Sequence, residues 1–423
     1  MNVVWVTKSF LDYRIPVYRE LSARCDGRFS LVFNADYVPP RCVRKVQEVL
    51  GPAAKGLRGE RALKLGPQNG FANKGLRIPY QPGLVSAVLR EKPDVLITDG
   101  FFQWTYAALW LRATRRIPHV MCYEKTAHTE RNAQWFRRAY RRRAMRWIDA
   151  ICCNGSLCGQ YVRNLGFRPD RIAYGHMAAD VEGLQRNLLT VTDEQVSRLA
   201  TRLGLQGVVF LFVGRLIPLK GLLELLDAWR QFNASRQGTP STLLFVGDGP
   251  LRDELIRRCE RSRIEGVRFA GAVDYDAIAP YFRCADALVM PTLEDNWSLV
   301  VPEAMACGLP ILCSQYNGCW PELVTPANGW VFDPLSPSDT VETLRAAASS
   351  RERLIQMGEA SRRIVSGHTA SHAAAAILKA VELACGAGRF APSEPPDESM
   401  VVQAHRGAEA EGDRRQHAYH QCR

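Results

Sequence analysis

Short apolar runs alternate with longer amphipathic stretches along most of the chain, and this rhythm occurs twice. Near-continuous apolar runs flanked by helix-like stretches indicate parallel strands covered by helices on both faces. In the first half we expect helices such as Ile15–Arg24 and Gly83–Glu91, and strands at Val3–Val6, Phe29–Phe33, Val95–Thr98, His119–Tyr123, Ala150–Cys152 and Arg171–Tyr174. In the second half we expect strands at Val208–Val213, Leu243–Val246, Val267–Ala270, Ala287–Met290, Ile311–Cys313 and Trp330–Phe332. The pattern predicts an α/β protein with two doubly wound, Rossmann-like domains.

The boundary between these domains is expected near Gly183–Glu194, where the pattern turns polar and irregular. We therefore predict one domain over 1–190 and a second over 191–384. Residues 385–423 lose all periodicity and are rich in Pro, Ser, Glu and Arg, which is typical of a disordered tail. The segment Pro39–Gly75 reads as a long basic loop.

Composition narrows the class of protein. The 423 residues are 47% hydrophobic and 23% charged, which is ordinary for a globular chain. Apolar runs stay short of the roughly 18 residues that a membrane-spanning helix needs, and Met1–Val6 is expected to be a strand, not a signal peptide. The 13 cysteines are scattered without metal-ligand spacing, so we expect reduced, structural thiols in the cytosol and no metal. The net charge of +12 favours phosphates, nucleic acid or an anionic membrane as partner.

The junction after the strand Val208–Val213 carries the first candidate chemistry. Gly214 lets the backbone approach a ligand, and Arg215 and Lys220 place two positive charges where a helix is expected to begin. A departing nucleoside diphosphate is a concentrated anion, and cations here would stabilise it. The alternative is a solvent-facing Arg and Lys at a helix start.

Two further junctions repeat this arrangement at the same predicted sheet edge. The turn Gly247, Asp248, Gly249, Pro250 and Leu251 follows the next strand, and a plain tight turn is its alternative interpretation. After Ala287–Met290, Pro302 suits a first helical position, so Glu303 falls in the first turn. Asp295 lies on the loop before it, which predicts two carboxylates on one rim. Glu303 could otherwise be only a favourable charge at a helix N-terminus.

These junctions, in this order, resemble glycosyltransferase family four, whose members have the two-domain GT-B fold. The resemblance covers about residues 1–384 and is strongest over 208–335, where GR…KG, VGDGPL, FAGAV (Phe269–Val273) and EAMACGLP stand in family order. It implies that the first domain binds an acceptor and the second a nucleotide-sugar. It also implies that the reaction retains anomeric configuration and needs no metal or other cofactor.

The resemblance also implies residue roles. Arg215 and Lys220 would hold the diphosphate, and Glu303 would accept hydrogen bonds from the ribose hydroxyls. Asp295 and the backbone of Asn296, Trp297, Ser298 and Leu299 would hold the transferred sugar, while Val273 and the loop Gly247–Leu251 would line the base pocket.

Three departures from the family pattern bear on sugar and acceptor. Asp295 stands where the family usually has Glu, with Glu294 one residue out of register. The usual glycine-rich turn after the first strand is replaced by Asp12–Pro16. Glu124 occupies a position that is His in many relatives, so we expect it to face the acceptor or to act as a weak base, with His128 as a nearby substitute.

The triplet Asp274-Tyr275-Asp276 matches the DxD pattern of metal-dependent glycosyltransferases of another fold. It precedes an apolar stretch that is expected to be helical, so a helix cap is the preferred interpretation.

One predicted helix is strongly basic. Phe136, Tyr140, Ala144 and Trp147 form an apolar stripe that is expected to dock on the domain. The arginines should then face an anionic membrane surface: Arg137, Arg138, Arg141, Arg142, Arg143 and Arg146. A solvated charged face is the alternative, and nucleic acid ranks last because no nucleic-acid module accompanies the patch.

The leading hypothesis is transfer of a hexose or N-acetylhexosamine from a UDP- or GDP-sugar to a lipid-linked glycan, as in bacterial surface polysaccharide or lipopolysaccharide synthesis. The enzyme would lie peripherally on the cytoplasmic face of the membrane. The alternatives are a sugar-nucleotide epimerase of the same fold and a non-catalytic, membrane-associated protein that binds nucleotide-sugars.

Overall fold

The structure is a computed structural model that describes residues 1–65, 76–101, 104–234 and 240–386. Residues Met1–Ala384 form one compact unit that contains two parallel sheets. The tail expected over 385–423 lies outside the described residues, apart from its first two positions.

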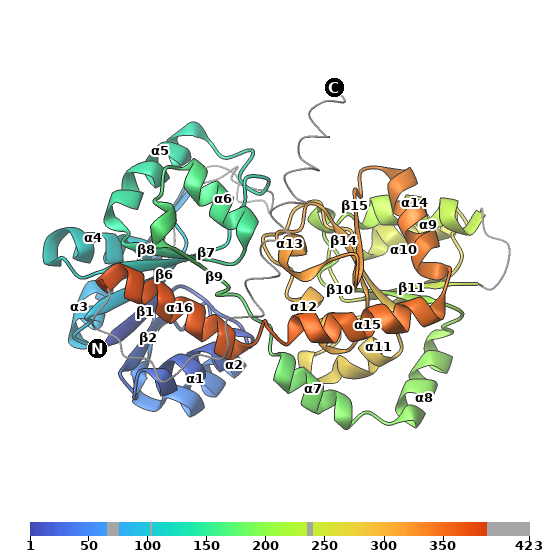
Figure 1. Ribbon diagram of the computed structural model, residues 1–423, viewed down its shortest axis with the longest axis horizontal. Coiled ribbons are helices and arrows are strands. Elements are labelled where there is room, and N and C mark those ends of the chain that lie inside the picture. The colour runs from blue at the N-terminus through green and yellow to red at the C-terminus, as the bar shows by residue number, and fades with distance from the viewer. Residues whose placement is uncertain (66–75, 102–103, 235–239, 387–423) are drawn as a thin grey trace. The chain divides into compact units, whose positions relative to one another are not determined.

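The first sheet is parallel throughout, in the order β3-β2-β1-β6-β7-β8-β9 (Figure 1). Its strands are β1 (Val3–Thr7), β2 (Phe29–Asn34), β3 (Ala54–Leu57), β6 (Val95–Asp99), β7 (His119–Tyr123), β8 (Ala150–Cys153) and β9 (Ile172–Tyr174). Consecutive residues of β1 from Val3 to Val6 are at most 2% exposed, so both faces of the sheet are covered.

The second sheet is also parallel, in the order β12-β11-β10-β13-β14-β15. Its strands are β10 (Val209–Val213), β11 (Thr242–Val246), β12 (Val267–Gly271), β13 (Ala287–Met290), β14 (Ile311–Ser314) and β15 (Gly329–Phe332). Trp229 and Phe232 pack edge-on against Phe210 in the core of this sheet. The prediction of two parallel, Rossmann-like sheets is confirmed.

Helices connect successive strands, as parallel pairing requires. Those that accompany the first sheet are α1 (Arg14–Arg24), α2 (Pro40–Leu50), α3 (Leu84–Arg90), α4 (Thr105–Arg115), α5 (Trp135–Ala144) and α6 (Ser156–Asn164), with short 3-10 turns η1 (Gly51–Ala53), η2 (Met145–Trp147) and η3 (Pro169–Arg171). Those that follow are α7 (Val181–Leu189), α8 (Asp193–Leu203), α9 (Leu222–Ala234), α10 (Arg252–Arg261), α11 (Ala279–Arg283), α12 (Val300–Ala306), α13 (Trp320–Leu323), α14 (Pro337–Ala348), α15 (Arg351–Val365) and α16 (Ala370–Cys385), with η4 (Pro218–Lys220) and η5 (Tyr275–Ala277).

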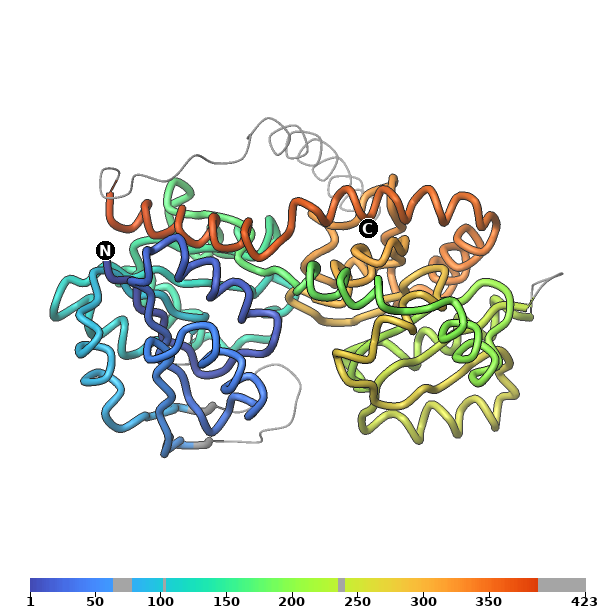
Figure 2. Tube along the Cα trace, turned by 90° about the horizontal axis from the view of Figure 1, so that it is seen from below, coloured from blue at the N-terminus to red at the C-terminus, as the bar shows by residue number. Residues whose placement is uncertain are grey.

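The last helix, α16, returns to the elements of the first sheet (Figure 2). Arg24 of α1 donates to Ser371 Oγ at 2.8 Å, and Arg171 of η3 donates to the carbonyl of Leu383. These contacts join α16, at the C-terminal end of the compact unit, to α1 and η3.

The expectation of a long loop over Pro39–Gly75 was wrong. The segment Pro39–Gly75 contains α2, strand β3 and the first arm, β4 (Arg61–Leu65), of a hairpin completed by β5 (Leu76–Tyr80). The helix α2 was not recognised because only Cys42, Val46 and Leu50 are buried in it, and the positions between them are mostly polar. The stretch around the predicted domain boundary, Gly183–Glu194, belongs to α7, α8 and the turn between them, and Thr192 and Gln195 cap α8 reciprocally.

Strand order reverses at one place in each sheet, and ligands of such sheets bind at this switch point, beyond the carboxyl ends of the strands. In the first sheet it lies between β1 and β6, and in the second between β10 and β13. The loops that leave these four strands are therefore the places where a site is expected.

Candidate active site

The loops after β10 and β13 are joined at the switch point of the second sheet. The carbonyl of Leu219 accepts from Leu293 N at 2.8 Å and from Thr292 Oγ1 at 3.0 Å. Gly221 has φ +65°, and a Cβ there would lie 2.0 Å from the carbonyl oxygen of Pro291. The two loops are therefore held at fixed positions relative to one another.

The backbone of the turn after β11 contacts the backbone of the turn after β10 so closely that a side chain does not fit at Gly247. Leu216 N donates to the carbonyl of Asp248 at 2.9 Å, and Leu251 N donates to the carbonyl of Leu216 at 3.0 Å. Gly247 has φ +139°, and a Cβ there would lie 1.9 Å from the carbonyl oxygen of Gly214. These glycines are therefore required for the backbones themselves to meet, whatever they do for a ligand.

Lys220 and Asp295 form an ion pair across this junction, with both side chains less than one-fifth exposed. Ser298 Oγ also donates to the Asp295 carboxylate at 2.5 Å, and Trp297 N donates to it at 3.1 Å. Burial opposes the charge on Asp295, but Lys220 and these hydrogen bonds outweigh it and lower the pKa of the carboxyl group. Asp295 therefore anchors Lys220 and shapes its own loop. Its predicted contact with the transferred sugar stays a prediction.

Arg215 lies on the same loop after β10, five residues before Lys220. Its side chain is exposed, and within the described residues it forms no hydrogen bond or ion pair. An arginine at the switch point without a protein anion is available for a ligand anion.

Glu303 lies in the first turn of α12, where Pro302 precedes it as predicted. Burial, together with the negative charge of Asp180, raises the pKa of Glu303 to about 8. An acid group held protonated near neutral pH, close to the switch point, is a functional-site candidate.

The other predicted residues fall on the same rim. Trp297 and Ser298 are buried, Leu299 is the N-cap of α12, and Val273 packs against the core beyond β12. Asn296 accepts a hydrogen bond from Asn154 Nδ2 on its backbone carbonyl at 3.0 Å. That contact joins the loop after β13 to the loop after β8 of the first sheet.

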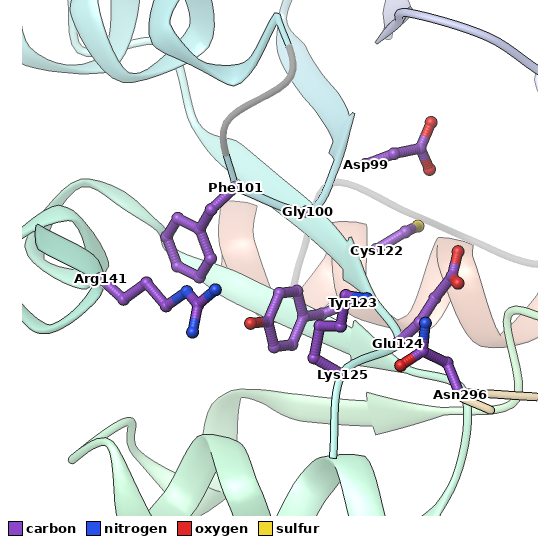
Figure 3. A pocket seen from close by; sticks show the side chains of 9 residues that line it. All are labelled: Asp99, Gly100, Phe101, Cys122, Tyr123, Glu124, Lys125, Arg141 and Asn296. Carbon is purple, nitrogen blue, oxygen red and sulfur yellow. The ribbon is translucent and has the colours of Figure 1, made fainter. Parts of the chain in front are cut away.

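A cavity of about 190 Å³ lies at the carboxyl ends of β6 and β7, beside Asn296 (Figure 3). It is lined by Asp99, Gly100, Phe101, Cys122, Tyr123, Glu124, Lys125, Arg141 and Asn296. Sequence reasoning found Glu124 and Asn296 but missed Asp99, Phe101, Tyr123 and Lys125. The signal was present, because these residues stand at or just beyond the ends of two predicted strands of the first sheet.

Glu124 projects into this cavity from the end of β7 (Figure 3). Burial raises its pKa, although the positive charges of Arg14 and Lys125 act against the shift. Its proposed substitute, His128, is used elsewhere: its Nε2 lies 2.8 Å from the Leu293 carbonyl oxygen and its ring stacks on Tyr316. Glu124 is therefore placed to face a ligand, and His128 joins the two loops.

The expected orientation of the basic helix α5 was wrong. Arg141 is only 3% exposed, and its guanidinium pairs with Glu130 and donates to the hydroxyl of Tyr161. Arg137 and Ala144 are buried on the same side. The residues that face solvent are the aromatic ones, Trp135, Phe136, Tyr140 and Trp147, together with Arg138, Arg142, Arg143 and Arg146.

The physical reason is an acid outside the helix. Glu130 precedes α5 in the chain, and its buried carboxylate makes burial of Arg141 tolerable. Once Arg137, Arg141 and Ala144 take the inner face, the aromatic stripe must point outward. Four of the six predicted membrane-facing arginines keep that orientation.

The DxD triplet does not behave as a helix cap. Asp274 precedes the short turn η5 but makes no side-chain capping hydrogen bond. In the part of the chain that the structure describes, three or more His, Cys, Asp or Glu side chains nowhere converge as metal ligands.

Comparison with known proteins assigns both halves of the chain. Residues 196–364 match the family described as Glycosyl transferases group 1, and residues 46–182 match Glycosyltransferase Family 4. The chain belongs to glycosyltransferase family 4. The GT-B fold predicted from the sequence is likewise confirmed.

Among family 4 relatives, a D-inositol 3-phosphate glycosyltransferase of Jonesia denitrificans is 27% identical over 194 residues, which is 44% of this chain and 46% of the relative. A GDP-mannose-dependent monoacylated alpha-(1-6)-phosphatidylinositol monomannoside mannosyltransferase of Corynebacterium glutamicum is 32% identical over 155 residues, covering 35% of this chain and 40% of that protein. The chain thus spans about half the length of the first of these relatives. The crystal structure of Anabaena HepE in complex with UDP has a TM-score of 0.69 at 17% identity, covering 90% of this chain and 100% of HepE.

The close backbone contact at Gly247 predicts that a larger residue there lowers the stability of the fold. Gly247→Ala should lower the free energy of unfolding by about 3 kcal/mol, because the new Cβ collides with the Gly214 carbonyl and the backbone must move. Gly27→Ala is the control: its φ is also positive, but its Cβ would meet open space, so it should cost about 1 kcal/mol. Urea unfolding measures both, and equal losses in the two variants would contradict the collision.

Glu303 predicts a pH dependence of stability. The folded chain keeps this proton up to about pH 8, whereas the ordinary pKa of a glutamate in an unfolded chain is 4.5. Between these values the folded state binds more protons, so the free energy of unfolding must fall as pH rises from 5 to 8. Glu303→Gln should flatten this fall, and the exposed Glu182→Gln should not. Denaturant unfolding at several pH values tests it, and unchanged slopes in Glu303→Gln would refute the shift.

Proposed function

We propose that this protein is a retaining, metal-independent transferase that moves a hexose or N-acetylhexosamine from a UDP- or GDP-sugar to a lipid-linked acceptor. The observation that carries the proposal is the Lys220–Asp295 pair at the switch point, with the exposed Arg215 on the same loop as Lys220. An ammonium fixed by a carboxylate and a free guanidinium are preorganised for a diphosphate. Their N–H donors would contact the diphosphate where a divalent cation does so in metal-dependent enzymes.

The donor would lie along the rim of the second sheet. Its diphosphate would meet Arg215 and Lys220, and its ribose would meet Glu303 in the first turn of α12. The two relatives named above act on nucleotide-sugars or inositol phosphates by their names, and HepE binds UDP. These likenesses support a nucleotide-sugar donor.

The acceptor would approach from the cavity that Glu124 and Asn296 share. In the reaction the bond from the anomeric carbon to the diphosphate breaks, and a bond to the acceptor oxygen forms on the same face. The acceptor proton passes to the departing phosphate oxygen. Because Asn296 adjoins both the donor loop and the cavity, this arrangement supports transfer to an acceptor over epimerisation of the donor.

Arg215→Ala should lower turnover about 10²–10³-fold, because a donor to the developing anion is lost. Nucleotide release from a panel of UDP- and GDP-sugars, on vesicles that carry dodecyl glycosides, measures turnover, and calorimetry with UDP and GDP measures binding. Arg202→Ala, an exposed arginine of α8, is the matched control and should be silent.

Near-normal turnover in Arg215→Ala would refute its role, and loss of all activity after treatment with a chelator would refute metal independence. Consumption of donor without any acceptor would indicate an epimerase. Binding of nucleotide without turnover would indicate a non-catalytic protein.

We also propose that the outer face of α5 docks the enzyme on an anionic membrane, on the cytoplasmic side and in the setting of bacterial surface glycan synthesis. Exposed aromatic rings suit the interfacial region of a bilayer, and each nearby arginine contributes about 1 kcal/mol toward anionic lipid. Four outward arginines give an upper bound of about 4 kcal/mol. None of the described helices is long and apolar enough to cross a membrane.

Arg142→Glu with Arg143→Glu should abolish co-sedimentation with vesicles of phosphatidylcholine and phosphatidylglycerol. Trp135→Ala should weaken binding about tenfold at both low and high salt, because its contribution is hydrophobic. Arg202→Glu with Arg257→Glu, both exposed in the second half of the chain, should bind like the native protein. Native-like binding by the α5 variants would exclude this face.

A further inference from the structure

The cavity beside Asn296 has a polar side and an aromatic side. Asp99, Glu124 and Asn296 lie on one side, and Phe101, the Tyr123 ring and Arg141 on the other (Figure 3). Tyr123 is 2% exposed, and its hydroxyl, which points toward Arg141, has no hydrogen-bond partner in the described part of the chain. The same holds for the buried side-chain oxygen of Asn296. A buried polar atom without a partner is costly, so a ligand with several hydroxyl groups is suited to this space.

The aromatic side of the cavity continues to the protein surface. Phe101 contacts Tyr123 edge-on with ring centroids 5.4 Å apart, and it contacts Tyr140 of α5 in the same way at 6.2 Å. Tyr140 is 37% exposed and belongs to the outward face that also carries Trp135, Phe136 and Trp147. An apolar path two rings long therefore joins the cavity to the exposed aromatic face.

Helix α5 separates the cavity from that face by its own thickness. Arg141 lines the cavity from the buried side of the helix, and Tyr140 stands on the outer side. A helix with its side chains is about 10–12 Å across. If the outer face rests in the lipid interface, the cavity lies only about this far above the lipid.

We propose that this cavity takes the headgroup of a short lipid-linked acceptor directly from the membrane, with the reacting hydroxyl in the first or second sugar ring from the lipid. The apolar part of the acceptor lipid runs past Phe101 and Tyr140 into the bilayer. The hydroxyl groups of its headgroup contact Tyr123, Asn296 and Glu124. Each additional sugar carries the reacting hydroxyl further from the lipid, so the tip of a long glycan does not fit. This inference rests on the proposed function and narrows its acceptor to one class.

Photocrosslinking tests the placement without knowledge of the sugar. The probe is a phosphatidylethanolamine whose headgroup carries a diazirine, in vesicles of phosphatidylcholine and phosphatidylglycerol with the full chain. Mass spectrometry should find adducts on α5 and also on the cavity segments 99–101 and 122–125. Adducts confined to α5, or absent altogether, would overturn the proposal.

Tyr140→Ala should reduce the cavity adducts at least tenfold relative to the adducts at Trp135, because the apolar path is cut, whereas a loss of docking alone would lower both sets of adducts together. Ile355→Ala, an exposed apolar side chain on α15, is the control and should leave both sets unchanged. Undiminished cavity adducts in Tyr140→Ala would also overturn the proposal. Calorimetry with UDP and GDP on the same variants separates the two hypotheses, since intact nucleotide binding with failed crosslinking leaves the donor site standing.

Discussion

The ion pair between Lys220 and Asp295 is the interaction on which the geometry of the second sheet's rim depends. It joins the loops that leave β10 and β13, where the strand order of the second sheet reverses. The Asp295 carboxylate also accepts hydrogen bonds from Ser298 Oγ and from the backbone N–H of Trp297. One carboxylate therefore positions both the Lys220 ammonium and the loop around it.

On the side of the first sheet, the buried ion pair between Arg141 and Glu130 determines how α5 is oriented. Arg141 is held inside by Glu130 and the Tyr161 hydroxyl, and this inner anchoring turns α5 so that its aromatic stripe meets solvent. The loop that carries Glu130 also carries His128 and Arg131, which contact Leu293 and Glu294 of the donor-side loop. The surface that could meet a membrane and the loop that could meet a sugar are thus linked through a few side chains.

Much of the fold could be predicted, because buried parallel strands are continuous apolar runs and the glycines and proline at their ends are local signals. The loops at Gly214, Gly247 and Asp295 were located for the same reason, since each directly follows such a strand. The segment Pro39–Gly75 was missed because α2 shows only a narrow buried stripe of three residues in a basic sequence. Asp99, Tyr123 and Lys125 were missed although they stand at or just beyond the ends of predicted strands, because no charge pattern singled them out.

The sequence by itself determined two doubly wound sheets, the rim on which the cations and carboxylates lie, and the family. The tertiary structure alone decided which partner each charge has. Lys220 meets an acid 75 positions away, and Arg141 meets one that lies outside its helix. Helical periodicity shows which residues share a face of a helix. Which face is buried depends on the side chains that pack against the helix, such as Glu130 against α5. A buried counter-charge can outweigh an apolar stripe, and only the folded chain shows where that charge stands.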